Sequence, residues 1–407
     1  MTQVPRLAVF QDEHSAPVLA ISEASRDVCR IVWVVGWSPH ETALRPLKRF
    51  GEVVDLTDMP FEDSVKRVVA AEPDGVIVFT DGPLRLAAAV AEKLDLPFHS
   101  PAVAERLTDK LLQRAALQEA GVAVPAFAAV RTGDVDATVP YPAVLKPRGG
   151  AGSRDTFLVE SPLQLAAALA ECDPGEEFIL EAWLPDRTAQ EDLDADLVSV
   201  ESIVRDGAIE HFMVAGRFPF APPFRATGTF LPSSLKPSDR DGVLAAARAA
   251  IEALGIRHGI IDTEIKRTPA GPRIIEVNGR MGGHRSAMVS RVGGPSLFVW
   301  AMRLALGQEI GPIQALPDSP IAFFRMIVAP PAATKVETVE GLSEVSGLPG
   351  IDTVRVNRNP GDVVNSRESS HLGHVIWIDG MVQTHAELAH LICDQIPSLL
   401  RMTFSSP

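Results

Sequence analysis

The sequence predicts a multidomain protein of mixed α/β and α+β class. A chain of 407 residues exceeds what one hydrophobic core usually organises. Apolar runs alternate with helix-like segments along the first hundred residues, and strand-like runs dominate the later part. We therefore expect four units, at residues 1–107, 108–184, 185–310 and 311–407.

Residues 1–107 are expected to form a parallel sheet with helices on both faces. The β-rich runs RIVWVVG, EVVDLTD and GVIVFTD alternate with the helix-like segments ETALRPLKRF, FEDSVKRVVAA and LRLAAAVAEKL. This order is typical of βαβ units, whose parallel strands are joined by a helix. The first unit is therefore predicted to be a nucleotide-fold-like domain.

Residues 108–184 are expected to form a small α+β lobe. A helix over 108–121 is predicted to begin with Thr108 as its N-cap and to stop at Gly121. The strand-like runs AFAAV, AVLKPRGG, DTFLVE and EFILEAWL follow, with one helix, SPLQLAAALAEC. Two inner strands of this lobe are predicted to flank a glycine-rich loop.

Residues 185–310 are expected to form a sheet-rich second lobe after a polar, acidic loop at 185–196. Its strands are LVSVESIV, IEHFMVAGRF, HGIIDTEIKR and RIIEVNGR, and its helices are DRDGVLAAARAAIEAL and PSLFVWAMRLALG. A linker-like segment, GPIQALPDSP, then precedes a smaller β-rich C-terminal unit at 311–407.

The composition argues against nucleic-acid and membrane partners. The net charge of -14 would repel the phosphates of nucleic acids and anionic lipids. Three cysteines without metal-type or redox-type spacing suit a reducing compartment. Because the sequence shows neither a long apolar run nor a signal-peptide pattern, we expect a cytoplasmic protein.

The segment Pro147–Arg154, PRGGAGSR, is a candidate phosphate-binding loop between two strands. It lacks the Gly-Lys-Ser/Thr ending of a P-loop. Glycines such as Gly150 let backbone N–H groups approach phosphate oxygens, and Ser153 adds a donor. The alternative is a mobile hairpin tip.

Two lysines precede or approach this loop. Lys146 ends the apolar strand before it, where an ammonium would neutralise phosphate charge. Lys110 lies near the start of its helix, where a cation is slightly unfavourable with the helix dipole, which suggests another role. The alternative for either is a solvated surface lysine.

The pair Glu264 and Glu276 is the most informative feature of the sequence. Two short strands joined by the turn TPAGP would place them opposite each other if the hairpin is symmetric about Ala270. Carboxylates about 5 Å apart repel by roughly 3 kcal/mol at an effective dielectric near 20. A divalent cation would reverse the sign of this interaction.

Strand alternation places Asn278 and Arg280 on the same face as Glu276, with Ile275 and Val277 facing the core. Oxygen ligands beside a guanidinium are typical of a hard-cation site with a phosphate clamp. A solvated sheet edge is the alternative for the hairpin alone. Together with the loop and the lysines, the pattern indicates Mg-ATP.

These motifs resemble those of the ATP-grasp superfamily, and within it the L-amino-acid ligase type of carboxylate–amine ligase. The resemblance covers most of the chain. It rests on Thr108-Asp109-Lys110 opening a helix, on Ala-Val-Leu-Lys-Pro, on the glycine-rich loop, and on Glu264 followed by Glu276-Val277-Asn278-Gly279-Arg280.

The resemblance implies an ATP-dependent ligase of the carbon–nitrogen bond-forming kind, which couples a small carboxylate to an amine through an acyl phosphate. It implies ATP and two Mg²⁺ ions, with Mn²⁺ as an alternative. It assigns the phosphates to Lys110 and Lys146, adenine to the backbone of Glu181, Ala182, Trp183 and Leu184, the metal to Glu264, Glu276 and Asn278, and the reacting groups to Arg280.

The chain departs from the family pattern at the substrate and ribose sites. Arg225, in Phe-Arg-Ala-Thr-Gly, stands where an acidic residue is usual, and it is predicted to contact substrate. The ribose-binding carboxylate is left open among Glu191, Asp192 and Asp196, with Glu191 as the first candidate.

The segment Gly283–Arg285 is predicted to bind the substrate carboxylate. It comprises Gly283, His284 and Arg285, and an ordinary structural histidine is the alternative for His284.

Two other functions stay open. One is an ATP-grasp carboxylase that activates bicarbonate, and the other is a nucleotide-binding regulator with an inactive site, which should have lost metal ligands. By resemblance, a homodimer is also expected.

Overall fold

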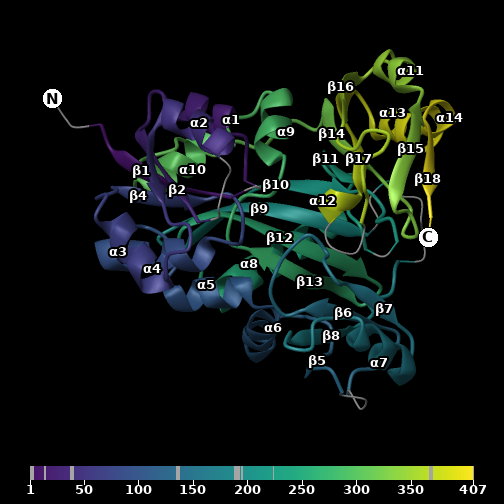
Figure 1. Cartoon of the computed structure of the whole chain (residues 1–407), viewed down its shortest axis with the longest axis horizontal. Helices are drawn as coiled ribbons and strands as arrows, with labels where there is room; N and C mark the ends of the chain where they lie inside the picture. Colours follow the sequence, from purple (N-terminus) through teal and green to yellow (C-terminus); the bar gives the residue numbers. More distant parts are fainter. Residues whose placement is uncertain are drawn as a thin grey trace.

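The computed structural model describes residues 4–12, 15–36, 41–133, 138–187, 193, 196–222, 224–365 and 370–406. Figure 1 shows an N-terminal domain, a large central sheet, a small lobe below that sheet, and C-terminal helices at the far end. Among the described residues, no helix combines the length and apolarity needed to cross a bilayer.

The N-terminal domain is a parallel four-stranded sheet, as predicted, with the order β3-β2-β1-β4. Its strands are β1 (Arg6–Gln11), β2 (Arg30–Val35), β3 (Glu52–Asp55) and β4 (Gly75–Val78). Its helices are α1 (Val18–Ser25), α2 (Glu41–Phe50), α3 (Phe61–Val69) and α4 (Leu84–Leu94). Strand β1 was not predicted from the sequence, although this buried strand pairs with two neighbours.

The sheet of the N-terminal domain packs on both faces, through separate apolar clusters. On one face, Phe10 of β1 and Val34 of β2 pack with α3 and α4. On the other, Leu7 and Trp33 pack with α1 and with Met302 of α10 (Leu297–Ala305). Because α10 comes much later in the chain, distant segments share this core.

The small lobe is an antiparallel sheet of order β5-β8-β6-β7 packed on one helix. It comprises β5 (Phe127–Val130), β6 (Ala143–Pro147), β7 (Phe157–Val159), α7 (Pro162–Ala170) and β8 (Phe178–Ala182). The glycine-rich loop joins β6 to β7 as predicted. However, β7 is an edge strand, so the prediction that two inner strands flank the loop is wrong.

Two short helices connect the N-terminal domain to the small lobe. Helix α5 (Pro101–Thr108) ends at the residue predicted to be an N-cap, and α6 (Lys110–Glu119) begins two residues later. Asp109 caps α6, because its carboxylate accepts the N–H groups of Leu111 and Leu112. The Thr108 prediction is therefore wrong, while Gly121 adopts a left-handed φ of 73° just after the helix, as its predicted stop requires.

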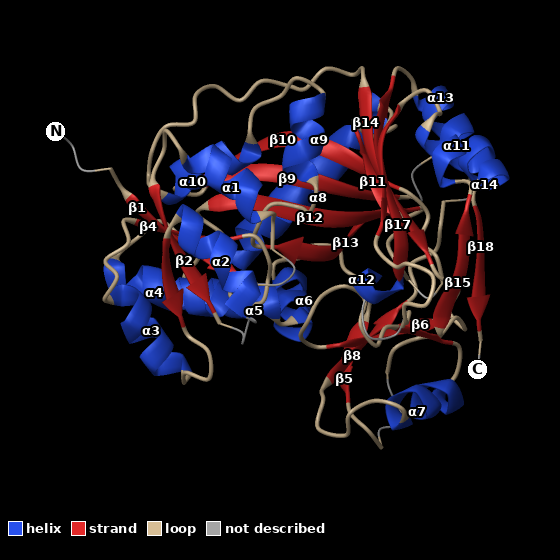
Figure 2. Ribbon diagram, turned by 45° about the horizontal axis from the view of Figure 1, so that its top comes forward, coloured by secondary structure: helices blue, strands red, loops and turns tan. Residues whose placement is uncertain are grey.

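The large sheet has eight antiparallel strands in the order β13-β12-β9-β10-β11-β14-β17-β16. They are β9 (Leu197–Arg205), β10 (Ala208–Arg217), β11 (Gly228–Leu231), β12 (Gly259–Thr268), β13 (Gly271–Asn278), β14 (Ile321–Val328), β16 (Ile351–Val356) and β17 (His374–Val382). Figure 2 shows these strands, in red, running from the middle of the molecule into its C-terminal part.

The two faces of the large sheet have different partners. Helix α8 (Pro237–Leu254) packs on one face, where Val200, Ile261 and Val277 are buried. Helices α9 (Arg285–Arg291) and α10 pack on part of the other face, over Ile203 and Ile260. The rest of that second face carries the polar residues discussed below.

The C-terminal part adds a two-stranded sheet and short helices around a separate apolar cluster. It contains β15 (Lys335–Glu340), α11 (Leu342–Ser346), α12 (Ser370–Gly373), α13 (His385–His390), a π-helical turn (Leu391–Gln395), α14 (Ile396–Leu399) and β18 (Arg401–Ser405). Because β14, β16 and β17 belong to the large sheet, strands on both sides of the expected boundary at 310 form one sheet.

Candidate active site

The hairpin of β12 and β13 places two carboxylates opposite each other. Glu264 is the cross-strand partner of Glu276, which confirms the predicted opposition of these carboxylates. Nearer the turn the pairs, such as Thr268 with Gly271, are not symmetric about Ala270, so the predicted symmetry of the hairpin is wrong. Asp262 and Asn278 form the next pair on the same face. The hairpin turn ends at Gly271, whose φ of 97° lies in the left-handed region that favours glycine.

The hairpin departs from simple alternation at one position. The register shifts after Glu264, so that Ile265 pairs with Ile274 and Ile275 is the extra residue of a β-bulge. Ile274 and Val277 are fully buried, whereas Ile275 is half-buried. The prediction that Ile275 faces the core is therefore wrong, because period-two counting does not include a bulge.

A third strand extends the polar face of the hairpin. On β9, Glu201 is the partner of Asp262, and Ser199 is the partner of Glu264. Two polar rows therefore cross three strands, Asn278–Asp262–Glu201 and Glu276–Glu264–Ser199. Neither Glu201 nor Asp262 was predicted as a site residue, although the alternation of polar residues within VSVES and IDTE is a usable signal.

Burial shifts the ionisation of these carboxylates. It raises the pKa of Glu201 to about 8, with Asp262 acting in the same direction and Arg285 opposing it. Burial also raises the pKa of Glu264, against the effect of Arg217 and with that of Asp262. Like charge is thus crowded on this face, and a bound cation would relieve it.

The three predicted metal ligands lie together and already contact protein groups. Arg217 forms a close ion pair with Glu264, and Lys110 Nζ lies 3.6 Å from Glu276 Oε1. Within the described ranges, no three histidine, cysteine, aspartate or glutamate side chains form a metal-type cluster. Two carboxylates and the amide of Asn278 are nevertheless donors of the kind that a hard cation requires.

Arg280 lies two residues after the end of β13 and is held by two carboxylates. Its Nη2 lies 2.7 Å from Asp81 Oδ2, and its Nη1 lies 3.7 Å from Asp262 Oδ2. Burial would lower the pKa of this guanidinium, but the two carboxylates outweigh that effect and raise it. Arg280 is therefore a fixed positive charge. Asp81 comes from the N-terminal domain and was not predicted from the sequence.

Lys110 connects the hairpin to the glycine-rich loop. Its Nζ donates to the carbonyl of Gly150 at 2.7 Å and is the same atom that lies near Glu276. Gly150 and Gly152 have φ angles of 91° and 71°, which explains why the loop needs glycine at these positions. The loop predicted to bind phosphate therefore lies next to the predicted metal ligands.

Lys146 belongs to a buried ion-pair cluster with Glu181. Lys146 Nζ lies 2.6 Å from Glu181 Oε2, and Nε of Arg114, a residue not predicted from the sequence, lies 2.8 Å from Oε1. Burial alone would raise the pKa of Glu181, but the two cations lower it to about 2. In the adjoining segment predicted to hold adenine, the N–H groups of Ala182 and Trp183 donate to carbonyls of the small lobe.

The acidic segment after β8 is described only in part. Leu184 is half-buried at its start. Glu191 and Asp192 lie outside the described residues, so their ribose role stays a prediction. The third candidate, Asp196, is 7% exposed, and its Oδ1 lies 3.3 Å from Arg267.

Arg225, whose contact with substrate stays a prediction, lies against the glycine-rich loop. Its Nη1 donates to the carbonyl of Ser153 at 2.6 Å. In return, the Ser153 hydroxyl donates to the carbonyl of Phe224 at 3.0 Å. These bonds join a turn of the large sheet to a loop of the small lobe.

The segment after Arg280 divides into exposed and buried groups. Gly283 and His284 are exposed, and the His284 ring stacks on Phe324 with 3.6 Å between ring centroids. Arg285 is buried, and its Nε lies 3.2 Å from Glu201 Oε1. His284 is thus the side chain of this segment that is accessible to a ligand. Arg285 is instead paired with Glu201, a member of the polar rows.

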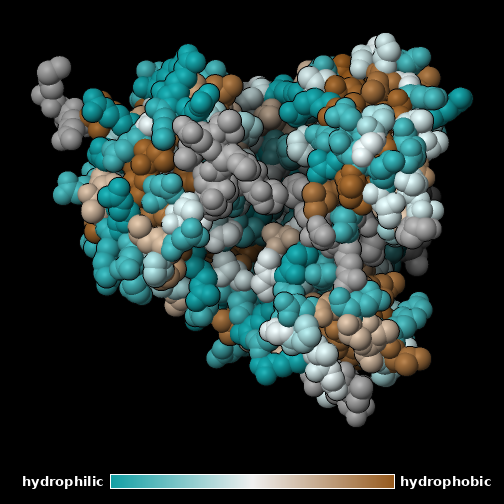
Figure 3. All heavy atoms as spheres, viewed as in Figure 1, coloured by the Kyte–Doolittle hydropathy of each residue, from teal (hydrophilic) through white to brown (hydrophobic). Residues whose placement is uncertain are grey.

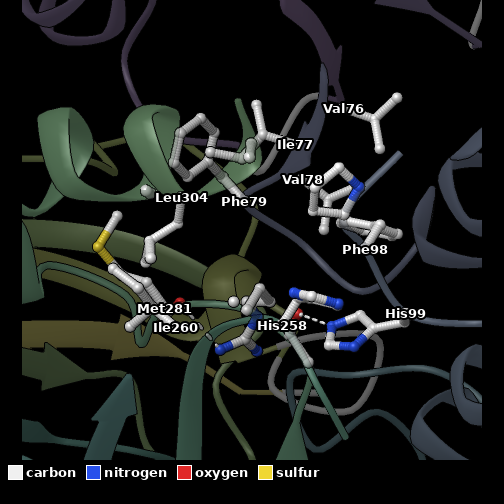
Figure 4. A pocket seen from close by; sticks show the side chains of 16 residues that line it. Val76, Ile77, Val78, Phe79, Phe98, His99, His258, Ile260, Met281 and Leu304 are labelled. Atoms are coloured by element: carbon white, nitrogen blue, oxygen red, sulfur yellow. Dashed lines mark hydrogen bonds between the residues drawn. The ribbon is translucent and has the colours of Figure 1, made fainter. Parts of the chain in front are cut away.

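A cavity of about 40 Å³ lies beside Arg280, between the N-terminal domain and the large sheet (Figure 4). His99 borders it, and its Nε2 donates to the carbonyl of Gly279 at 2.8 Å. Burial lowers the pKa of His99 to about 4, so the ring is neutral near pH 7. A Cβ on Gly279 would lie 2.6 Å from Leu107 Cδ1, so the backbone before Arg280 is tightly confined.

The sequence of residues 107–284 matches the family model described as an ATP-grasp domain. Residues 107–284 are therefore assigned to an ATP-grasp domain. Among the solved structures similar to the whole chain is an L-amino acid ligase from Bacillus licheniformis, with a TM-score of 0.79, 20% identity and full coverage of both chains. Another is a phosphoribosylglycinamide synthetase from Anaerococcus prevotii, with a TM-score of 0.69, 14% identity and coverage of 98% and 100%. These likenesses confirm the predicted fold.

The curated relatives of this chain are longer than it is. Carnosine synthase 1 of Gallus gallus is 35% identical over 178 residues, which are 42% of this chain and 19% of that protein. Carnosine synthase 1 of Homo sapiens is 28% identical over 330 residues, covering 74% of this chain and 39% of the relative. An uncharacterized protein, y4rH, of Sinorhizobium fredii is 24% identical over 298 residues, covering 71% and 60%. The chain spans less than two thirds of each relative's length.

Segments far apart in the sequence meet at one site. Lys110 comes from the connecting helix α6, the glycine-rich loop from the small lobe, Glu276 and Arg280 from the large sheet and the segment after it, and Asp81 from the N-terminal domain. On the side shown in Figure 3, hydrophilic residues predominate and the surface is hollowed between the N-terminal domain and the C-terminal part.

Proposed function

We propose that this chain, with its ATP-grasp domain, is an ATP-dependent ligase that joins a small carboxylate to an amine. The observation that carries the proposal is the opposed pair Glu264 and Glu276 beside Arg280, next to a glycine-rich loop that Lys110 contacts. Cation ligands, a fixed guanidinium and a lysine beside such a loop are the groups that γ-phosphoryl transfer requires. The likeness to an L-amino acid ligase supports amino acids as the substrate class.

Glu264, Glu276 and the amide oxygen of Asn278 are the proposed ligands of Mg²⁺, with two ions expected and Mn²⁺ as an alternative. The metal would neutralise charge on the β- and γ-phosphates. Arg217 and Lys110 lie against the two carboxylates, so a cation would compete with them for these oxygens.

The proposed reaction has two steps. A carboxylate oxygen of the substrate bonds to the γ-phosphorus while the bond to the β–γ bridging oxygen breaks, which gives an acyl phosphate and ADP. The neutral amine then attacks the acyl carbon, phosphate leaves with the electron pair of the broken C–O bond, and the amine loses a proton. Arg280, held by Asp81 and Asp262, is placed to stabilise the transferred phosphate and the oxyanion.

The presence of every predicted metal ligand favours an enzyme over an inactive regulator. The carboxylase alternative differs in needing bicarbonate as the activated carboxylate. The cytoplasmic location and the homodimer expected from the sequence stay predictions, as does the adenine site at Glu181–Leu184.

The test is phosphate release from Mg-ATP by the purified protein with amino acids and small carboxylates, singly and in pairs, and mass spectrometry of the products. We expect ADP, phosphate and an amide-linked product with a particular pair. Incorporation of labelled bicarbonate into a product would instead establish the carboxylase. Nucleotide binding without turnover on any pair or on bicarbonate would favour the regulator.

A further inference from the structure

A turn of the large sheet holds the glycine-rich loop through two reciprocal hydrogen bonds. Arg225 Nη1 donates to the Ser153 carbonyl at 2.6 Å, and the Ser153 hydroxyl donates to the Phe224 carbonyl at 3.0 Å. The same guanidinium nitrogen lies 3.5 Å from the carbonyl of Gly152. Two adjacent residues of the turn thus contact two adjacent residues of the loop, which holds the two segments in one register.

The backbone at both sides of this contact is strained. Phe224 has a φ of 65° and Ser153 a φ of 54°, in the left-handed region that residues other than glycine rarely occupy. Such conformations persist where surrounding contacts impose them, and they are concentrated at clamps and switch regions. The reciprocal bonds therefore select one arrangement of the loop out of those it could adopt.

Hydrogen bonds to strand β14 fix the turn to the large sheet. The carbonyl of Thr227 accepts the N–H of Met326 at 2.8 Å and Nη1 of Arg325 at 3.1 Å, both on β14. The Phe224 ring also lies 5.8 Å from that of Trp183, in the segment predicted to hold adenine. Because the turn is fixed to the large sheet, movement of the small-lobe loop away from that sheet must break the hydrogen bonds that Ser153 makes with Arg225 and Phe224.

The surroundings of Arg225 do not suit a substrate contact. Its side chain is 1% exposed, and burial lowers the pKa of its guanidinium. It donates to carbonyls of the loop, and the acidic group that acts on its pKa is Asp155 in the same loop region.

We propose that Arg225 is a positioning residue, the large-lobe half of a clasp that holds the glycine-rich loop closed over the phosphates of a bound nucleotide. This inference rests on the proposed function, because the nucleotide under the loop is part of that function. The clasp must open for ADP to leave, so Arg225 sets the dissociation rate of the nucleotide and leaves the affinity for carboxylate and amine unchanged.

The test is the dissociation rate of a fluorescent ADP analogue from wild-type protein and from Arg225→Met, which removes the donors but keeps an extended side chain. We expect dissociation about tenfold faster in the variant, the order of effect expected for one hydrogen bond from a charged group. The KM for ATP should rise, while the KM values for carboxylate and amine stay constant. Arg225→Lys, which keeps the charge and a single donor nitrogen, should fall between the two.

Two further variants keep the result interpretable. Ser153→Ala removes the return bond to Phe224, and in the Arg225→Met background it should add little, because the two bonds act as one clasp. Arg248→Met is the matched control. Arg248 donates to the carbonyl of Ile209 at 2.9 Å from α8, on the opposite face of the sheet, and its loss should leave ADP dissociation unchanged.

The two proposals fail in different ways. Absence of ADP binding by the wild-type protein would contradict the proposed function. Wild-type binding with unchanged ADP dissociation in both Arg225→Lys and a folded Arg225→Met would overturn the clasp. A higher KM for carboxylate or amine with an unchanged ADP rate would instead place Arg225 in the substrate pocket.

Discussion

At the scale of single residues, the charge balance around Glu276 decides whether the site can hold a metal. Glu276 opposes Glu264 across the hairpin and lies beside Lys110. The repulsion between the two carboxylates favours cation binding but destabilises the fold when no cation is bound. Function and stability should therefore respond differently to its removal.

Glu276→Gln should lower the turnover of ATP by about 10²- to 10³-fold, the order of effect seen when a preorganised electrostatic group is removed. The thermal midpoint should stay constant or rise, because a like-charge pair is relieved. ADP formation and thermal denaturation measure the two effects. Glu252→Gln, on an exposed turn of α8, is the control, and near wild-type turnover in Glu276→Gln would refute the metal assignment.

His99 makes the stability of the fold depend on pH. Its folded pKa of about 4 lies below the ordinary value of 6.5, so between these values the unfolded chain binds more protons. The free energy of unfolding therefore keeps the full contribution of neutral His99 above pH 6.5. It falls by up to about 3 kcal/mol as the pH drops to 4.

Urea denaturation at pH 7 and pH 5 checks this prediction. His99→Asn keeps a donor for the Gly279 carbonyl and should show a smaller loss between the two pH values than wild type. His390 lies on helix α13 in the C-terminal part, and His390→Asn should lose as much free energy of unfolding as wild type. An equal loss in His99→Asn would contradict the role of His99.

At the scale of elements, Gly279 lies between the end of β13 and Arg280. The backbone path at Gly279 therefore determines the position of Arg280. A Cβ there would lie 2.6 Å from Leu107 Cδ1 and 2.9 Å from His99 Nε2. Gly279→Ala should lower the free energy of unfolding by about 1–3 kcal/mol through overpacking. Chemical denaturation measures the change.

Gly242→Ala is the matched control, and it should change the free energy of unfolding in the opposite direction. Gly242 lies within α8, where an added Cβ would meet its nearest neighbour at 3.7 Å. Alanine there should raise the free energy of unfolding by up to about 1 kcal/mol, through its higher helix propensity. Equal effects of the two substitutions would show that the space around Gly279 is not confined.

Elements with a strong local pattern could be predicted from the sequence. The β12–β13 hairpin has a clear turn and two alternating strands, from which the opposition of Glu264 and Glu276 was predicted, whereas the bulge at Ile275 that sets their register was not. The neighbouring strand β9 is distant in the sequence, so pairing of Glu201 with Asp262 could not be inferred from periodicity. The Asp109 cap was missed because Thr108 is an equally good capping residue by type.

At the scale of the whole molecule, the site depends on all parts of the fold at once. Asp81 and His99 come from the N-terminal part, and Lys110 and the glycine-rich loop from the small-lobe segment. No local sequence signal connects Asp81 with Arg280, because their ion pair exists only after the domains pack. The same holds for strands β14 and β17, which complete a sheet begun by an earlier segment.

In the proposed mechanism, the substrate carboxylate is activated by direct transfer of the γ-phosphoryl group. The most direct measurement uses a carboxylate substrate labelled with ¹⁸O, with its amine partner and Mg-ATP, and mass spectrometry of the released phosphate. We predict one ¹⁸O atom in each phosphate formed during coupling, because the acyl C–O bond breaks after the carboxylate oxygen has bonded to phosphorus. Release of unlabelled phosphate during formation of the amide would contradict this claim.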